Sequence, residues 1–390
     1  MLVRLIYLTV AGSQSQQQFS ICKVLKVEVA TNSVDHPVDT KPHYKSCGDN
    51  KFCVPFYLCN NKTGSINTDG TNLIDVRFDG NKPCLDYLEQ CCSIDEENGD
   101  TLKLEETIPF KQGCGYMNTE GLLFKITGNK NGETEYAEFP WMIAVLKQEK
   151  INNKILNIYQ CGGSLIHPSV ILTAAHCVVR NEPKDLLTRA GEWDTQTKDE
   201  LFEEQDREIN EIVIHEHFSR GGLHNNIALL FTLVPFTLKP HVNTVCLPLP
   251  HMNFDFSRCF ATGWGKDAFG QEGKYQVILK KIELPIIPFT TCQRQLRRTR
   301  LGKFFRLHES FLCAGGELGK DTCRGDGGGP LTCPIPDSKD RFYQAGIVSW
   351  GIGCGDTNPG VYANVGFLRL WIDKIFNSRN LDKGYYIPEL

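Results

Sequence analysis

The stretch that decides the fold is Asp321-Thr322-Cys323-Arg324-Gly325-Asp326-Gly327-Gly328-Gly329-Pro330, followed by Leu331-Thr332-Cys333. Two cysteines can pin this segment, and its glycines permit the tight backbone turns of a loop that presents a reactive side chain. Asp326 stands beside the position at which such a loop would hold a hydroxyl nucleophile. That position is Gly327, which has no side chain. The segment therefore has the layout of a nucleophile loop without the nucleophile.

Two upstream segments offer the partners that a nucleophile would need. Leu172-Thr173-Ala174-Ala175-His176-Cys177 places a histidine among small residues. Asn225-Asn226-Ile227-Ala228-Leu229-Leu230 opens an apolar run where an aspartate would orient that histidine, and Asn226 stands in its place. A Ser-His-Asp triad needs a hydroxyl, a base and a carboxylate. The hydroxyl and the carboxylate are both missing at these positions, where Gly327 and Asn226 stand.

The order of these positions and the motifs around them resemble the chymotrypsin/trypsin family over roughly residues 126–378. Further motifs of the resemblance are Cys161-Gly162-Gly163-Ser164-Leu165-Ile166, Ala261-Thr262-Gly263-Trp264-Gly265 and Val348-Ser349-Trp350-Gly351. The resemblance implies two six-stranded antiparallel β-barrels with the site in the cleft between them. Many short strands separated by Gly, Pro and Asn turns independently predict an all-β fold. Apolar residues at helical spacing predict a C-terminal helix over residues 364–376.

Composition and the amino terminus indicate a secreted protein. The chain has 390 residues, 17 cysteines and a net charge of -4, which is too small to indicate a nucleic-acid partner. Cysteines in ordered clusters are typical of an oxidising compartment. Arg4 before the apolar run of residues 5–11 predicts a signal peptide over residues 1–15, with an ordinary terminus as the alternative. No later run has the roughly 18–20 apolar residues of a membrane-spanning helix.

The region before the large domain is rich in cysteine. Six cysteines fall within residues 47–92, and disulfides worth about 2–4 kcal/mol each would stabilise so small a segment. Zinc is the alternative, but paired Cys-x-x-Cys motifs and histidines are missing. The spacing resembles the clip domain that precedes protease domains in arthropod secreted proteins. We expect an N-terminal segment at 16–46, an acidic linker at 93–125, the protease-like domain at 126–380 and a tail at 381–390.

The two resemblances imply a disulfide partner for all but one of the cysteines. The implied pairs are Cys47–Cys91, Cys53–Cys84, Cys59–Cys92, Cys114–Cys246, Cys161–Cys177, Cys259–Cys333, Cys292–Cys313 and Cys323–Cys354. Spacing alone would leave the clip connectivity open. Cys22 remains, either as a free thiol or as an intermolecular link.

The family resemblance also implies a specificity pocket. Asp321 matches the position that makes the pocket prefer Arg or Lys, and Gly351 and Gly360 match the small residues that keep it open. A carboxylate that faces a pocket is a good receptor for a cation. The alternative is a remnant that other side chains fill.

Proteolytic activation is altered relative to active relatives, which are cut before an Ile-Val-Gly-Gly start. The candidate start here is Ile126-Thr127-Gly128 after Lys125, and Arg77 in the clip loop is a second candidate. We expect a limited cut by an upstream trypsin-like protease at one of these two sites. The Cys114–Cys246 bond would keep the clip and protease-like parts joined after a cut between them.

Three features can each be interpreted either as ordinary solvent-exposed surface or as a functional site. Asn61-Lys62-Thr63 is a glycosylation sequon, used or unused. The acid-rich segment 192–206 corresponds to a loop where some family members bind calcium, although it defines no ligand geometry. Between Cys292 and Cys313 lies a cationic cluster that is either a solvated face or a dock for a polyanion or a protein. Its members are Arg294, Arg297, Arg298, Arg300, Lys303 and Arg306.

The whole arrangement resembles the clip-domain serine protease homologues of the phenoloxidase-activating-factor type. Loss of a nucleophile costs about 10⁶ in rate and acid-to-amide replacement about 10⁴, so the enzyme interpretation ranks last. The family implies a non-catalytic cofactor of arthropod haemolymph. Cut by an upstream protease, it would assemble with prophenoloxidase and its activating protease, with a homo-oligomer as one candidate form. Recognition of microbial surfaces is the alternative, and residual trypsin-like endopeptidase activity is the third interpretation.

Overall fold

The computed structural model describes residues 45–48, 51–55, 72–75, 84, 89–93, 110–122, 124–127, 132–151, 154–195, 202–265, 276–317, 326–353 and 357–388. Several predictions of the sequence concern residues outside these ranges. They are the signal peptide at 1–15, Cys22, Cys59, Asn61, Arg77, Asp321, Cys323 and Cys354.

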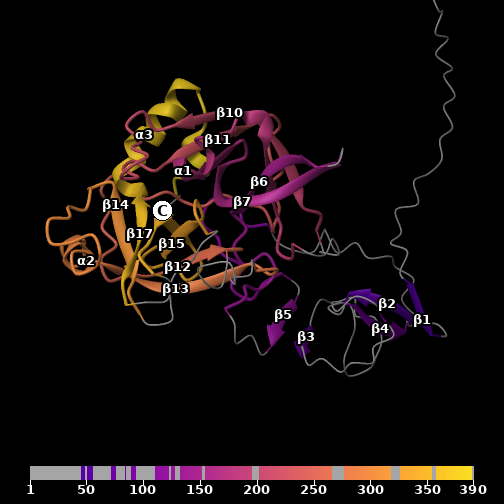
Figure 1. Ribbon diagram of the computed structural model, residues 1–390. Helices are drawn as coiled ribbons and strands as arrows, with labels where there is room; N and C mark the ends of the chain where they lie inside the picture. Colours follow the sequence, from indigo (N-terminus) through magenta and orange to yellow (C-terminus); the bar gives the residue numbers. More distant parts are fainter. Residues whose placement is uncertain are drawn as a thin grey trace, which may run out of the picture. The chain divides into compact units, whose positions relative to one another are not determined.

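The first barrel is a closed sheet in the order β10-β11-β8-β7-β6-β9, with antiparallel neighbours (Figure 1). Every residue of β8 and β11 is buried, because both strands lie in the core of the domain. The strands are β6 (Met142–Ile151), β7 (Lys154–His167), β8 (Val170–Thr173), β9 (Leu186–Ala190), β10 (Gln205–Ile214) and β11 (Ala228–Thr232).

The second barrel is also closed, in the order β12-β13-β14-β17-β16-β15. All its neighbours pair antiparallel. The strands are β12 (Arg258–Gly263), β13 (Lys280–Ile287), β14 (Phe311–Gly315), β15 (Pro330–Pro334), β16 (Phe342–Trp350) and β17 (Pro359–Asn364). The predicted pair of six-stranded antiparallel barrels is confirmed.

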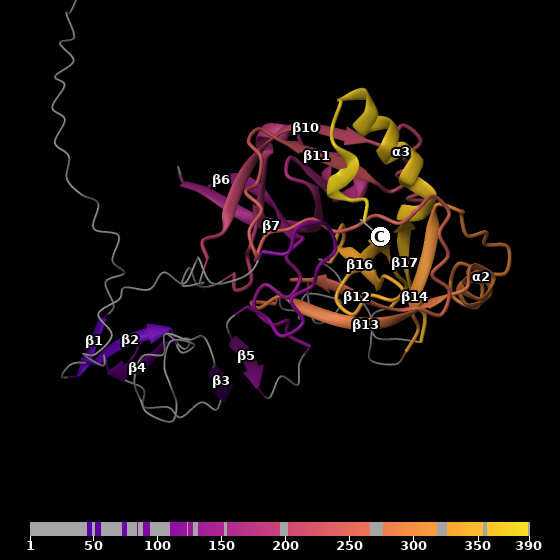
Figure 2. The same ribbon diagram turned by 180° about the vertical axis from the view of Figure 1, so that it is seen from behind.

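The helices of the described ranges each span 14 residues or fewer. They are α1 (Ala175–Val178), η3 (Pro183–Asp185), α2 (Phe289–Leu296), α3 (Val365–Ser378) and η4 (Lys383–Tyr385). The predicted C-terminal helix is confirmed as α3, which contacts β16 and is drawn in yellow in Figure 2. The Asn364 side chain caps it by accepting a hydrogen bond from the Phe367 N–H. Its buried face repeats at helical spacing through Leu368, Ile372 and Phe376. None of the helices in the described ranges has the length and apolar character needed to cross a bilayer.

The N-terminal disulfide-rich region contains a three-stranded sheet in the order β1-β2-β4. Its strands are β1 (Lys45–Gly48), β2 (Lys51–Pro55) and β4 (Glu89–Ser93). The Cys47–Cys91 and Cys53–Cys84 bonds join this region, and Cys92 is also disulfide-bonded. Disulfides therefore take the place of a large apolar core here.

A small parallel pair joins the clip region to the linker. β3 (Asn72–Asp75) pairs with β5 (Phe124–Thr127), in a register that sets Lys125 opposite Leu73. The candidate cleavage residue Lys125 thus lies within a paired strand. Further along, the structure forms the Cys114–Cys246, Cys161–Cys177, Cys259–Cys333 and Cys292–Cys313 bonds.

Candidate functional site

His176 is held at the end of β8 by a single helical turn, α1. The Cys161–Cys177 disulfide ties this turn to β7. The turn is too short to position a side chain by itself, so the disulfide and the buried neighbours Ala175 and Val178 fix it. The imidazole is half-buried at the boundary between the two barrels.

Asn226 lies two residues before β11 and is completely buried. Its Oδ1 accepts a hydrogen bond from the backbone N–H of His176 at 2.9 Å. Its Nδ2 lies 2.7 Å from Nδ1 of the same histidine and donates to Oγ of Ser349, also at 2.7 Å. Ser349 belongs to β16, so Asn226 connects the two barrels at the site.

These contacts determine which imidazole nitrogen carries the proton. A backbone N–H can only donate, so the amide atom facing it must be the oxygen. The NH₂ group therefore faces the ring and donates to Nδ1, which must hold a lone pair. In the neutral ring the proton is then on Nε2. A catalytic base needs the opposite arrangement, with a lone pair on Nε2 to take the nucleophile's proton.

Burial lowers the pKa of His176 below its ordinary value, which favours the neutral ring. Contact with Asn226 would raise this pKa only if the amide oxygen accepted from the ring. The orientation fixed by the His176 backbone N–H excludes that arrangement. His176 is therefore a neutral hydrogen-bond donor at Nε2.

Gly327 lies directly against this donor. A Cβ built on Gly327 would be 2.9 Å from Nε2 of His176 and 3.4 Å from its Cε1, so the ring fills part of the nucleophile's space. The loop backbone is well anchored, because Gly327 O accepts from Gly162 N and Gly328 N donates to Val348 O, both at 2.9 Å. The loop keeps its position and lacks only the side chain.

Asp326, beside Gly327, turns its carboxylate toward the loop after β12. Its Oδ1 accepts a hydrogen bond from Gly265 N at 2.9 Å. A Cβ on Gly265 or Gly263 would collide with this carboxylate, which explains the glycines of the Ala261-Thr262-Gly263-Trp264-Gly265 motif.

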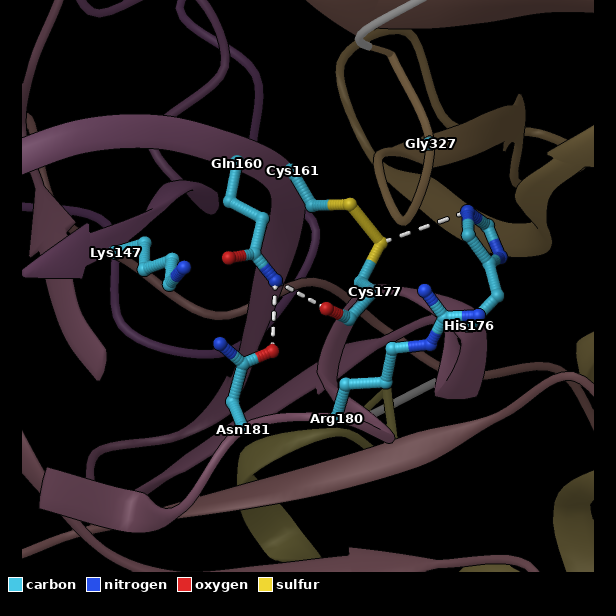
Figure 3. A pocket seen from close by; sticks show the side chains of 8 residues that line it. All are labelled: Lys147, Gln160, Cys161, His176, Cys177, Arg180, Asn181 and Gly327. Carbon is cyan, nitrogen blue, oxygen red and sulfur yellow. Dashed lines mark hydrogen bonds between the residues drawn. A yellow bond between two sulfur atoms is a disulfide. The ribbon is translucent and has the colours of Figure 1, made fainter. Parts of the chain in front are cut away.

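A cavity of about 420 Å³ opens beside two of the triad positions, His176 and Gly327 (Figure 3). The charged side chains that line it within the described ranges are both cationic, Lys147 and Arg180. Gln160 is part of the cavity wall, and its Nε2 donates hydrogen bonds to Cys177 O and to Asn181 Oδ1. The remaining lining residues are Cys161, His176, Cys177 and Gly327.

The expected specificity pocket is present only in part among the described residues. Gly351 follows the end of β16, and Gly360 lies in β17 beside the residue that pairs with Trp350. These two glycines therefore lie near each other at adjoining strand ends. Asp321 lies outside the described residues, so the arrangement of all three residues stays a prediction.

The acid-rich segment 192–206 is organised around one cation within its described part. Arg189 pairs with Asp206 at 2.7 Å, with Glu192 at 3.0 Å and with Glu204 at 3.6 Å. A guanidinium thus occupies the position among these carboxylates that a calcium ion would need. The clusters of metal-binding residue types found in the described ranges, Cys47-Cys53-Cys84 and Cys161-His176-Cys177, consist mainly of disulfide-bonded cysteines.

Sequence reasoning missed the polar residues that complete the site. Ser349 stands in the Val348-Ser349-Trp350-Gly351 motif, but its bond to Asn226 joins residues 123 positions apart. The cavity residues Lys147, Gln160 and Arg180 come from separate segments of the first barrel and form no local motif. The sequence feature that could have indicated Ser349 as a site residue is the motif Val348-Ser349-Trp350-Gly351, whose small polar side chain contacts Asn226.

Two barrels, a histidine after β8 and a glycine-rich loop facing it define the class of the molecule. Residues 129–372 match the family model described as trypsin, and residues 40–93 match the one described as serine protease clip domain PPAF-2. The chain belongs to the trypsin family, as a clip-domain serine protease homologue.

Individual relatives are similar over most of the chain. Phenoloxidase-activating factor 2 of Galleria mellonella is 54% identical over 283 residues, which are 71% of this chain and 93% of that protein. Inactive CLIP domain-containing serine protease A8 of Anopheles gambiae is 38% identical, over 83% of this chain and 87% of its own. Inactive CLIP domain-containing serine protease A28 of the same mosquito is 36% identical, over 86% and 91%.

Proposed function

We propose that this chain is a non-catalytic protein of the clip family that acts by binding other proteins. The observation that carries the proposal is the contact at Gly327. No side-chain atom exists there to attack a peptide bond, and the N–H-bearing nitrogen of His176 lies 2.9 Å from the position of the missing Cβ. Peptide hydrolysis through an acyl-enzyme needs both an oxygen nucleophile and a base, and the site offers neither.

The relatives suggest where the binding takes place. One similar protein is called a phenoloxidase-activating factor and two are called inactive proteases. We therefore propose a secreted cofactor that assembles with prophenoloxidase and its activating clip-domain protease in haemolymph, after processing by an upstream protease. The proposal includes a signal peptide at 1–15, glycosylation at Asn61 and a homo-oligomer as one form of the processed protein.

A reconstitution experiment tests this function. The processed protein, purified, is added to prophenoloxidase and its activating protease, and phenoloxidase activity is followed with time. The expected result is activity well above that of the two-component mixture, with no hydrolysis of an Arg-containing chromogenic substrate by the chain alone. An unchanged rate of phenoloxidase formation would refute the cofactor role.

Processing is proposed at Lys125 or Arg77. Lys125 lies after Cys114 in the chain, and Cys114 is bonded to Cys246. A cut at Lys125 should therefore leave both fragments in one band on a non-reducing gel and separate them on a reducing gel. A Lys125→Gln variant that is still cut would assign the site to Arg77 or elsewhere, and Arg77→Gln is the paired test.

A second function, binding to anionic microbial surfaces, is favoured by one surface. Within the described residues, Arg298, Arg300 and Arg306 are exposed and make no ion pair. Lys303 lies 5.0 Å from the ring centroid of Phe304, which is 84% exposed. Co-sedimentation with bacteria, compared between wild type and the triple variant Arg298→Gln, Arg300→Gln, Arg306→Gln, tests this function. Equal sedimentation of the two proteins would remove it.

A further inference from the structure

The cavity beside Gly327 has an unusual set of polar groups. Among the residues that the structure describes, two cationic side chains, Lys147 and Arg180, line it without an acidic one beside them in the lining. Lys147 is paired with Glu149 at 2.7 Å, which neutralises part of its charge. Arg180 is exposed at the cavity edge and makes no ion pair with any residue that the structure describes. The described part of the wall therefore carries excess positive charge.

His176 adds a neutral donor to this wall. Its proton is on Nε2, the nitrogen that faces Gly327. The contact recorded for Nε2 among the described residues is with Cys177 Sγ at 3.7 Å, and a disulfide sulfur is a weak acceptor. This N–H is thus open to a stronger acceptor in the cavity.

The two departures from an active triad act together on this cavity. Gly327 removes the side chain that would lie between His176 and the ligand. Asn226 reverses the polarity of Nε2, because a carboxylate in its place would draw the ring proton to Nδ1 and leave a lone pair on Nε2. A lone pair repels an anion, whereas an N–H binds one. The altered site therefore favours ligands that an intact triad would not.

We propose that this cavity is a carboxylate-binding site, which takes an acidic group of a partner peptide between Arg180, Lys147 and the N–H of His176. The guanidinium supplies charge-assisted hydrogen bonds, and the imidazole adds a directed donor at the former nucleophile position (Figure 3). The carboxylate is either an Asp or Glu side chain or the C-terminus of a cleaved chain. The site deepens the proposed binding function and rests on it.

Three probe peptides separate these sources. The first, acetyl-Ala-Ala-Glu-Ala-amide, has a side-chain carboxylate, the second, acetyl-Ala-Ala-Ala-Ala, has only a C-terminal one, and the third, acetyl-Ala-Ala-Gln-Ala-amide, has none. Binding to the full chain is measured by the ¹⁵N shift of His176 Nε2 in histidine-labelled protein. At least one carboxylate peptide should bind about tenfold or more tightly than the neutral peptide, as one charge-assisted contact requires. Equal affinity of all three peptides would overturn the proposal.

Variants assign the effect to the cavity. Arg180→Gln should reduce carboxylate affinity by about tenfold. It removes the lining cation that forms no ion pair with a described residue. Lys150→Gln is the charge-matched control, because Lys150 is an exposed lysine of β6 outside the cavity lining. At a pH where the ring is neutral, Asn226→Asp should also weaken binding and shift the Nε2 resonance to the unprotonated range, because the ring proton then lies on Nδ1. Equal affinities of Arg180→Gln and Lys150→Gln would exclude the site.

Peptide binding and the reconstitution experiment, both carried out on wild type, distinguish this inference from the proposed function. If wild type promotes phenoloxidase formation but no peptide binds, the carboxylate site is wrong and the cofactor role stands. If a carboxylate peptide binds but wild type does not promote activation, the cofactor role is wrong and the site stands.

Discussion

The two halves of the altered site have lost different things. The first-barrel half keeps the hydrogen bonds through which Asn226 holds both the backbone and the ring of His176. The second-barrel half keeps the loop backbone, anchored at Gly327 and Gly328, but no side chain. In the first-barrel half, the amide of Asn226 replaces a carboxylate of nearly the same shape. In the second-barrel half, Gly327 lacks the nucleophile's side-chain atoms, and the loop backbone is still anchored by its hydrogen bonds. Packing constrained the first half more than the second.

The difference has a physical cause. Asn226 is fully buried and has partners on both barrels, so replacing it by an apolar residue would leave buried donors unsatisfied. A nucleophile side chain at position 327 would lie between the His176 ring and the cavity, where it contributes to chemistry rather than to the core. An amide for a carboxylate and a glycine for a hydroxyl residue are therefore changes that abolish a triad and spare the fold.

The largest expected effect is on catalysis. Gly327→Ser alone should remain nearly inactive, because Nε2 of His176 still carries a proton. The double variant Asn226→Asp, Gly327→Ser should exceed it by about 10⁴-fold in kcat, which is the cost of replacing the aspartate of a Ser-His-Asp triad by an amide. Processed proteins are compared on an Arg-containing chromogenic substrate. Similar rates for the single and the double variant would show that the tautomer is not what disables the first half.

The next effect is on stability and compares the two halves directly. Asn226→Leu should lower the free energy of unfolding by about 3 kcal/mol, since it leaves the His176 backbone N–H and the Ser349 hydroxyl without their partner. Gly327→Ala should change it by less than about 1 kcal/mol, because a small shift of the His176 ring relieves the 2.9 Å contact with the added Cβ and Cys161 Sγ lies at an ordinary 3.7 Å. Urea unfolding at pH 7 measures both. A larger loss for Gly327→Ala than for Asn226→Leu would reverse the comparison.

Acid should weaken the first-barrel side through its buried histidines. Burial lowers the pKa of His241 to about 4, and its ring stacks on Phe202 with centroids 4.7 Å apart. The unfolded chain binds a proton near pH 6.5 and the folded one does not, so stability is present above pH 6.5 and is lost as the pH falls toward 4. The expected loss from this residue between pH 7 and pH 5 is about 2 kcal/mol. Urea midpoints of wild type and His241→Gln test it, and an equal pH dependence would contradict the assignment.

The smallest expected effect is spectroscopic. In wild type the pKa of His176 lies below its ordinary value because the ring is buried. In Asn226→Asp a carboxylate replaces the amide donor and favours the imidazolium, so the pKa of His176 should rise. An NMR titration of the ring Hε1 proton follows the change in wild type and variant. A downward shift would mean that Asn226 does not donate to Nδ1 in the wild type.

Local motifs predicted most of the fold. The glycine-rich loop, the histidine motif and the apolar run after Asn226 carry the family resemblance, which implied the two antiparallel barrels, and the helical spacing of apolar residues over 364–376 predicted the helix now seen as α3. The parallel pairing of β3 with β5 was not predicted, since two four-residue strands far apart in the chain carry no common pattern. The cavity was missed for the same reason, because Lys147, Gln160 and Arg180 meet only in the closed barrel.

The sequence by itself determined which atoms are absent: Gly327 has no oxygen and Asn226 has no charge, whatever the fold. Only the tertiary structure decided what the remaining atoms do. The backbone N–H of His176 orients the Asn226 amide, the amide selects the ring tautomer, and the tautomer directs an N–H into a cationic cavity. The direction of a hydrogen bond depends on which groups face each other across about 3 Å, and such neighbours come from segments that the chain order keeps apart.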